Sequence, residues 1–195
     1  MINLQKEEKA FLCTWFGSLL SHELTEEQLK QYQQGTFEPL FELLSELLSE
    51  RGFSSQVQQI KSDIAQINEM PYGQLELAAD FTQLFLLDGE SSALPYASAY
   101  LEEEDLATNL DYMDSLLTQF GLQFNQESKE PSDHIGVYLE ILNKLVTESD
   151  SEKQQDFIQN YLLIWLIPFN EKVQKVKTKT MFYQNIVAVL VAIFS

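Results

Sequence analysis

Apolar residues recur at helical spacing along almost the whole chain, and this pattern limits the possible folds more than any other feature. The stretch from residue 4 to 20 shows it best, with an apolar stripe at helical steps: Leu4, Phe11, Leu12, Trp15, Phe16, Leu19 and Leu20. No stretch of useful length alternates apolar and polar residues as a half-buried strand does. We therefore predict an all-α protein of roughly nine to ten helices.

Residues that typically begin or end helices support this prediction. Thr25–Gln28 has the form of a capping box, in which two side chains satisfy free backbone N–H groups at a helix start. Pro39 is tolerated in the first turn of the next apolar stretch, and Gly52 is placed to end it. Gly121 likewise follows an apolar stripe over 103–120.

A polar segment divides the chain into two helical parts. Residues 122–132, LQFNQESKEPS, contain a proline and lack clear periodicity, so they are the best candidate for a hinge or linker. The N-terminal part is then 1–121 and the C-terminal part 133–195. Three helical segments are expected in the second part: 133–147, 152–167 and 170–194, the last with a break near Thr178. We expect Ser151–Gln154 to cap the middle segment and Pro168 to end it.

Acidic residues far outnumber basic ones. The chain has 30 Asp and Glu against 12 Lys and Arg, which gives a net charge of −18, and four of the lysines lie between residues 172 and 179. Such a surface repels nucleic acids and anionic lipids and attracts basic or positively flanked partners. The charge therefore excludes nucleic-acid binding, and it fits either a basic partner or a need for solubility alone.

The apolar C-terminus is too short to cross a membrane. Residues 186–194 are consecutively apolar, whereas a membrane span needs roughly 20 such residues. We predict a buried terminal helix and no stable membrane insertion. The N-terminus lacks the features of a signal peptide, and the single Cys13 cannot form an internal disulfide. These features predict a cytoplasmic protein in which Cys13 is a small buried apolar residue.

Side chains suited to catalysis, metal binding or phosphate binding are scarce. The seven glycines are scattered singly, so no phosphate-binding loop can be formed from them. Of the two histidines, His22 lies in a turn between expected helices, where we expect it to be exposed. His134 has no second His or Cys at a metal-ligand spacing. We therefore expect no catalytic residue, no cofactor site and no metal site.

The pair Asp133–His134 has the residue types of an acid–base site. Pro131 favours extended backbone before it, and Ser132 or Asp133 can cap a helix that begins there. On this interpretation Asp133 is the cap and His134 lies in the first helical turn. The alternative is a hydrolase that uses the pair for general acid–base chemistry, but no nucleophile is evident. The residues alone favour a helix start.

Three segments taken together resemble a known family. They are DFTQLFLL (80–87), LPYASAYL (94–101) and EPSDHIGVYLEIL (130–142). They are similar to motifs of the TorD/DmsD/NarJ family of cytoplasmic chaperones for molybdoenzymes, and within it to the members that serve trimethylamine-N-oxide reductase. The resemblance implies an all-helical protein without enzymatic activity. Such chaperones bind an apo-enzyme, often through its twin-arginine leader, until the molybdenum cofactor is inserted, and so delay export.

The resemblance also implies which residues bind the partner. The two later motifs and the end of the first supply these positions: Leu84, Phe85, Pro95, Tyr96, Ser98, Tyr100, Glu130, Pro131, Asp133 and His134. The sequence departs from many members at Gly89, which comes late after the Leu-Phe pair, and at Tyr96, where many have Trp.

A twin-arginine leader is basic at one end and apolar in the middle, so its receptor needs acidic groups beside an apolar groove. We expect Asp133 and neighbouring carboxylates to hold the arginines. The apolar part is expected to lie against Leu84, Phe85, Pro95, Tyr96 and Tyr100.

Further expectations concern assembly and competing functions. A polar hinge at 122–132 would allow two chains to exchange parts in a domain-swapped homodimer, or one chain to fold back as a compact monomer. The resemblance to some family members also implies weak guanine-nucleotide binding. A generic acidic helical adaptor is the alternative function. Whether the leader, the mature enzyme or both are bound is left open by the sequence.

Overall fold

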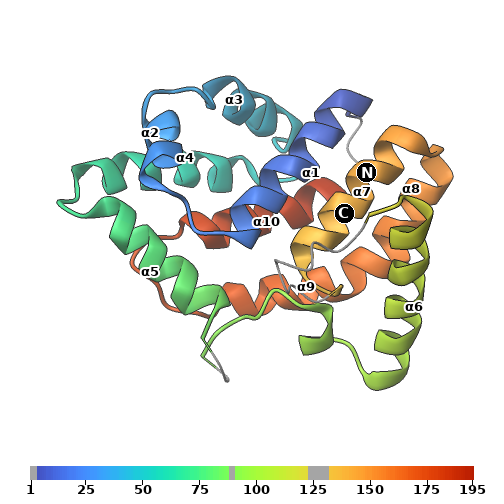
Figure 1. The fold of residues 1–195 in the computed structure, drawn as a ribbon. Coiled ribbons are helices and arrows are strands. Elements are labelled where there is room, and N and C mark those ends of the chain that lie inside the picture. Colours follow the sequence, from blue (N-terminus) through green and yellow to red (C-terminus); the bar gives the residue numbers. More distant parts are fainter. Residues whose placement is uncertain (1–3, 88–90, 123–131) are drawn as a thin grey trace. The chain divides into compact units, whose positions relative to one another are not determined.

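The computed structural model describes residues 4–87, 91–122 and 132–195. The helices in this part of the chain are α1 (Lys6–Ser21), α2 (Glu26–Gln33), α3 (Glu38–Leu47), α4 (Ser54–Glu69), α5 (Gly73–Phe85), α6 (Glu103–Gln119), α7 (Ile135–Glu148), α8 (Ser151–Phe157), α9 (Leu163–Val173) and α10 (Phe182–Phe194) (Figure 1). A 3-10 turn covers Ala97–Ala99, and a π-helical turn, Ile158–Leu162, joins α8 to α9 without a break. Strand-like pairing in the described residues is limited to one bridge, so the all-α prediction is confirmed.

The helices form two compact units. The first contains His22–Leu94 and Asn170–Ser195, and the second contains Asn3–Ser21 and Pro95–Phe169. Each unit therefore combines segments from both sides of 122–132, which differs from the expected division into 1–121 and 133–195. The reason is packing between distant helices, since α10 lies against α4 and α1 lies against α7. Within the proposed hinge, residues 123–131 are outside the described part of the chain.

In the first unit the terminal helix α10 is the centre of the core. It packs against α4 (Figure 1). Almost every one of its side chains is buried. Tyr183 meets the rings of Phe81 and Phe85 on α5 edge-on, with centroid distances of 5.4 and 5.8 Å. The prediction of a buried terminal helix is confirmed. No helix in the described residues is both long enough and apolar enough to span a bilayer.

A buried carboxylate attaches the connection between α9 and α10 to α5. Asp80 is only 4% exposed. Its Oδ1 accepts a hydrogen bond from the Lys179 N–H at 2.7 Å, and its Oδ2 accepts from the N–H and the hydroxyl of Thr180 at 2.8 and 2.7 Å. Since these donors are a hundred residues away along the chain, Asp80 fixes the tertiary position of this turn.

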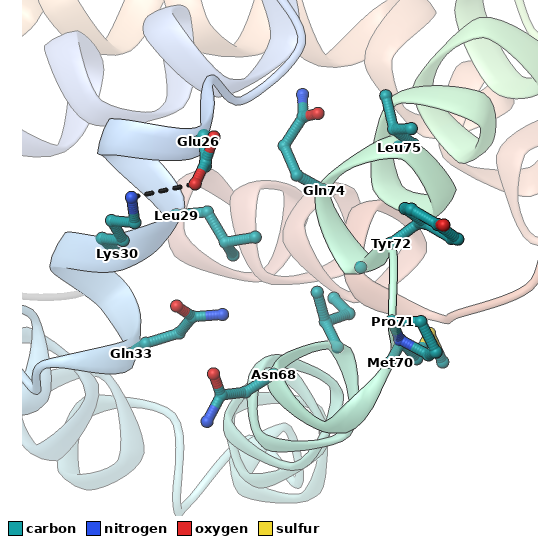
Figure 2. Close-up of a pocket in the computed structure, with 12 residues that line it drawn as sticks. Glu26, Leu29, Lys30, Gln33, Asn68, Met70, Pro71, Tyr72, Gln74 and Leu75 are labelled. Atoms are coloured by element: carbon teal, nitrogen blue, oxygen red, sulfur yellow. Dashed lines mark ion pairs between the residues drawn. The ribbon is translucent and has the colours of Figure 1, made fainter.

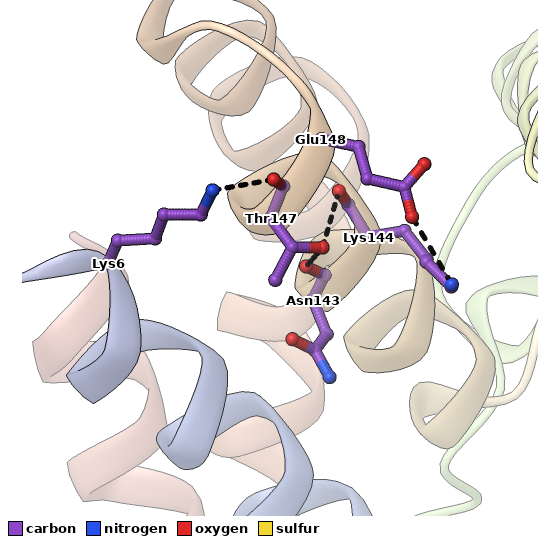
Figure 3. Close-up of polar contacts among 5 residues, drawn as sticks. All are labelled: Lys6, Asn143, Lys144, Thr147 and Glu148. Atoms are coloured by element: carbon purple, nitrogen blue, oxygen red, sulfur yellow. Dashed lines mark hydrogen bonds and ion pairs between the residues drawn. The ribbon is translucent and has the colours of Figure 1, made fainter.

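In the second unit α1 and α7 pack along each other. The close approach is tightest at Gly136, where an added Cβ would collide with the Ser21 hydroxyl; a Cβ at Gly17 would make an ordinary contact, 3.8 Å from Cβ of Leu139. A polar contact also links the two helices, because the Lys6 ammonium donates to the Thr147 carbonyl at 2.6 Å (Figure 3). Cys13 on α1 is buried as expected, and burial raises its pKa to about 12.

Most helix boundaries match the expectations, and a few differ. The Thr25 capping box, the helix end before Gly121 and the exposure of His22 are confirmed. The helix expected to end at Gly52 ends earlier, at Leu47, and Gly52 lies in the turn that follows, with positive φ. At α8 the cap is Asp150, whose Oδ1 accepts from the Lys153 N–H at 2.9 Å, and not Ser151. The expected helix end at Pro168 is also wrong.

Pro168 lies inside α9. A proline there removes the N–H that would bond to the carbonyl of Ile164, four residues earlier. Ile164 is 42% exposed, so water can replace the missing donor. The helix can therefore continue through the proline.

Candidate functional site

The structure brings the loop motif and the linker motif together in the second unit. The Ala97 N–H donates to the Asp133 carbonyl at 3.0 Å, and the Ile135 N–H donates to the Pro95 carbonyl at 2.9 Å. These bonds form the antiparallel bridge between Tyr96 and His134, whose rings lie 5.0 Å apart. Two segments that the sequence separates by 35 residues or more thus form one hydrogen-bonded surface.

Asp133 holds this surface with its side chain as well as its backbone. Its Oδ2 accepts a hydrogen bond from the Ser98 N–H at 3.0 Å, and the residue is 6% exposed. The expectation that Asp133 caps the following helix is therefore wrong. It anchors the start of the 3-10 turn instead, because the Ser98 N–H needs an acceptor there.

His134 is the true N-cap of α7. Its Nδ1 accepts from the Gly136 N–H at 3.1 Å, so the ring proton of the neutral imidazole lies on Nε2. In a catalytic Asp–His pair the carboxylate would accept from the imidazole. Here the two side chains accept from different backbone N–H groups, which weakens the hydrolase alternative. Within the described residues, no three His, Cys, Asp or Glu side chains come together as a metal site.

The residues of the loop motif differ in their exposure to solvent. Ser98 is exposed, Tyr96 and Tyr100 are half-buried, and Pro95 is buried. The Tyr100 ring stacks on Trp165 at a centroid distance of 6.4 Å and meets Phe169 edge-on at 5.8 Å. Burial raises the pKa of Tyr100 well above its ordinary value. The loop thus packs on Trp165 and Phe169 through Tyr100 and leaves parts of Tyr96, Ser98 and Tyr100 accessible at the surface.

A buried polar network in the same unit was not predicted from the sequence. The Tyr138 hydroxyl donates to Oδ1 of Asn109 at 2.6 Å, and Nδ2 of Asn109 donates to the Tyr161 carbonyl at 2.9 Å. Asn109, 1% exposed, therefore links α6, α7 and the π-helical turn. The one available signal was a single amide among the apolar residues of the α6 stripe. Burial raises the pKa of Tyr138, and the charge of Asp133 adds to the effect.

Leu84 and Phe85 do not line a groove at the surface of this structure. They belong to the first unit and are 0% and 1% exposed at the end of α5. Phe85 packs against Tyr183, and the Leu84 carbonyl accepts from the Ala93 N–H at 2.7 Å. Because α5 is apolar on more than one face, these side chains are used by the core. Glu130 and Pro131, the remaining expected site residues, lie outside the described part of the chain.

The first unit carries a groove of mixed polarity that no motif indicated. It has a volume of about 430 Å³ and lies between α2, the end of α4 and the start of α5 (Figure 2). Tyr72 and Leu75 are 71% and 62% exposed beside it, although both are large and apolar. At its edge Glu26 forms an ion pair with Lys30 at 2.9 Å. Exposed apolar side chains grouped in this way are typical of a surface that binds another chain.

A glycine allows the groove to form. Gly73 opens α5 directly against the end of α4, where an added Cβ would collide with the carbonyl of Ile67. The close approach of the two helix ends places Tyr72 and Leu75 together at the surface.

Comparison with known proteins assigns the chain to a family. Residues 48–171 match the family described as Nitrate reductase delta subunit. The chain is 51% identical over 195 residues to the "Chaperone protein TorD" of Histophilus somni (strain 129Pt), covering all of this chain and 99% of that one. It is 48% identical to the TorD chaperone of Pasteurella multocida (strain Pm70), covering 98% and 95%.

A solved structure has the same fold. The crystal structure of a protein described as a redox enzyme maturation protein from Archaeoglobus fulgidus matches with a TM-score of 0.51 and 18% identity. The match covers 99% of this chain and 94% of that one. At this identity the likeness concerns the fold alone. Together with the full-length similarity to the TorD proteins, these findings show that the chain belongs to the TorD family of molybdoenzyme maturation chaperones.

Proposed function

We propose that the protein is a cytoplasmic chaperone for apo trimethylamine-N-oxide reductase. It binds the mature part of that enzyme, its twin-arginine leader or both, before the molybdenum cofactor is inserted. It thereby favours a cofactor-competent conformation and delays export. The observation that carries the proposal is the full-length similarity to TorD chaperones at 51% identity. The protein acts by binding, without catalytic chemistry of its own and without a bound cofactor.

The joined motif surface is the proposed contact for the leader's arginines. Asp133 lies at its centre with a carboxylate that is held in place by Ser98, and His134 and Tyr96 flank it. Three loop residues that are exposed or half-exposed complete the proposed contact, together with Glu130 and Pro131. These three are Tyr96, Ser98 and Tyr100. A carboxylate with a fixed geometry can accept the guanidinium hydrogen bonds of an arginine with little loss of entropy.

The apolar part of the leader needs exposed apolar side chains, which Leu84 and Phe85 do not supply. The groove with Tyr72 and Leu75 does supply them, next to the carboxylate of Glu26. An apolar helix that enters such a groove would bury both side chains. We therefore assign the apolar contact to this groove.

Calorimetric titration with a twin-arginine leader peptide tests the proposal. An unrelated basic peptide of equal charge is the control, since a net charge of −18 attracts any cation. We expect selective binding of the leader, and weaker binding in Asp133→Asn and in Leu75→Ser. Asn keeps an acceptor for the Ser98 N–H and removes only the charge. Equal binding of both peptides would reduce the acidic surface to nonspecific attraction, and full leader affinity of Asp133→Asn would remove Asp133 from the site.

Two further properties belong to the proposal. A homodimer that exchanges parts through 122–132 would rebuild both units from two chains, since each unit contains segments from both sides of this region. Light scattering that finds a monomer at all protein concentrations would contradict it. We expect guanine nucleotides to bind only weakly, because the sequence offers no phosphate-binding loop and the charge is strongly negative.

A further inference from the structure

Cations are concentrated at one place on this acidic protein. Of its 12 Lys and Arg residues, four are lysines between 172 and 179. Three of them, Lys172, Lys175 and Lys177, line a depression of about 500 Å³ in the first unit. Gln83, Ser91 and Val176 complete its lining. This lysine site is opposite in sign to the surface as a whole.

Buried polar groups fix the backbone that carries these lysines. Asp80 binds the turn at Lys179 and Thr180 through three hydrogen bonds. The side-chain amide of Gln184, which is fully buried, donates to the Val176 carbonyl at 3.3 Å, and the backbone carbonyl of Gln184 accepts from the Gln174 side chain at 2.9 Å. The lysines therefore extend from a fixed segment, and only their side chains must be ordered when a ligand binds.

Stability of the fold does not account for this cluster. Lys172 lies in the last turn of α9, where the helix dipole favours a cation, but Lys175 and Lys177 follow the helix. The ion pairs of the described residues involve other lysines: Lys30 with Glu26, Lys61 with Glu38 and Lys144 with Glu148. Lys175 and Lys177 are exposed, and they repel each other in the absence of an anion.

We propose that the lysine site binds an acidic segment of the mature part of the partner enzyme. This inference rests on the proposed chaperone function and adds a second contact to it. A twin-arginine leader is basic, so the lysine site repels it while the surface at Asp133 attracts it. The site is suited to side-chain carboxylates because its ammonium groups lie on separate flexible stems, and the amide of Gln83 and the hydroxyl of Ser91 can bond to the backbone of a peptide.

Binding of a glutamate-rich peptide, and of apo trimethylamine-N-oxide reductase that lacks its leader, tests the proposal. The variant replaces Lys172, Lys175 and Lys177 by Gln. The matched control replaces Lys9, Lys144 and Lys153 by Gln, so the net charge changes equally. We expect the lysine-site variant to bind both probes more weakly, by a factor on the order of ten, while the control binds them as the wild type does.

Leader binding separates this proposal from the chaperone function. The lysine-site variant should bind the leader at least as well as the wild type, because a repulsive group is removed. If both variants lose the same affinity for the acidic probes, the binding depends on net charge and not on the lysine site, and the proposal is refuted. Binding of pyrophosphate but neither protein probe would assign the site to phosphates and overturn it as well. If the acidic probes fail to bind while the leader binds, the lysine site is refuted and the chaperone function stands.

Discussion

Replacement of Asp80 by Ala should destabilise the protein more than replacement of almost any other acidic residue. The substitution removes the acceptor for three donors: the N–H groups of Lys179 and Thr180 and the Thr180 hydroxyl. Thr180 is 3% exposed, so water cannot easily reach its donors. The turn that joins α9 to α10 would lose its attachment to α5.

The expected loss follows from the hydrogen bonds. A bond to a charged acceptor contributes about 1.5–3 kcal/mol, and an orphaned buried donor costs about 1–3 kcal/mol. These values do not add fully, and loss of the buried carboxylate removes a desolvation cost that offsets part of them. We expect a decrease of about 3–5 kcal/mol in the free energy of unfolding, a large part of the roughly 5–15 kcal/mol typical of a domain.

Guanidinium titration followed by two signals measures this effect. Far-UV circular dichroism measures the unfolding of helices in both units. Tryptophan fluorescence measures the unfolding of the second unit, because Trp15 and Trp165 both belong to it. Asp80 lies in the first unit, so the circular dichroism midpoint must fall. Asp80→Asn, which keeps one acceptor, should lose less. Asp111→Ala on the exposed side of α6 is the control, and an Asp80→Ala midpoint equal to that of the control would refute the reasoning.

Three other substitutions test individual contacts. Burial raises the pKa of Asp63, so the contribution of this side chain to stability is complete below its ordinary pKa and is lost as the pH rises through the raised value. Asp63→Asn should therefore be more stable than the wild type at pH 7, and the difference in the free energy of unfolding should become smaller in acid. A difference that does not change with pH would contradict this. Asn109→Ala should lower the free energy of unfolding by about 2–3 kcal/mol in thermal or denaturant unfolding, because two buried hydrogen bonds are lost, and a loss below about 0.5 kcal/mol would contradict their importance. Gly73→Ala should cost about 1–3 kcal/mol, since its Cβ would collide with the carbonyl of Ile67, and an unchanged unfolding midpoint would show that the helix ends separate easily.

The sequence predicted the local structure well because local signals determine it. Three- and four-residue spacing placed nearly every helix, and Gly121 follows the end of α6 with positive φ, as only glycine does easily. The errors arose where tertiary contacts decide between neighbouring candidates. Ser132, Asp133 and His134 can all cap a helix or a turn, and the contact of Asp133 with Ser98 leaves the cap to His134. Only the fold shows that contact.

The two compact units were not predictable from linear order. The apolar pattern shows that α10 has a partner but does not identify α4, because any apolar stripe can pack against any other. The same limitation affected Leu84 and Phe85, which the core uses on a helix that is apolar on several faces. The groove beside Tyr72 was not predictable from the sequence for a different reason, because exposed apolar residues do not recur at a characteristic spacing.

The residues that carry the family resemblance have structural roles, and this determines how they should be tested. Asp80 opens the first motif and holds the turn before α10. Asp133, in the last motif, is 6% exposed and accepts from the Ser98 N–H, and its side chain is also of an acidic type. Replacement by Ala removes both properties, so a lost activity would not identify a binding residue. Asp133→Asn keeps the acceptor and removes the charge, whereas Ser98→Pro keeps the charge and removes the donor. If leader affinity falls in Asp133→Asn and survives in Ser98→Pro, the charge of Asp133 binds the leader. Full affinity in Asp133→Asn would remove the charge of Asp133 from the site whatever the result for Ser98→Pro, because Ser98 is itself part of the proposed contact.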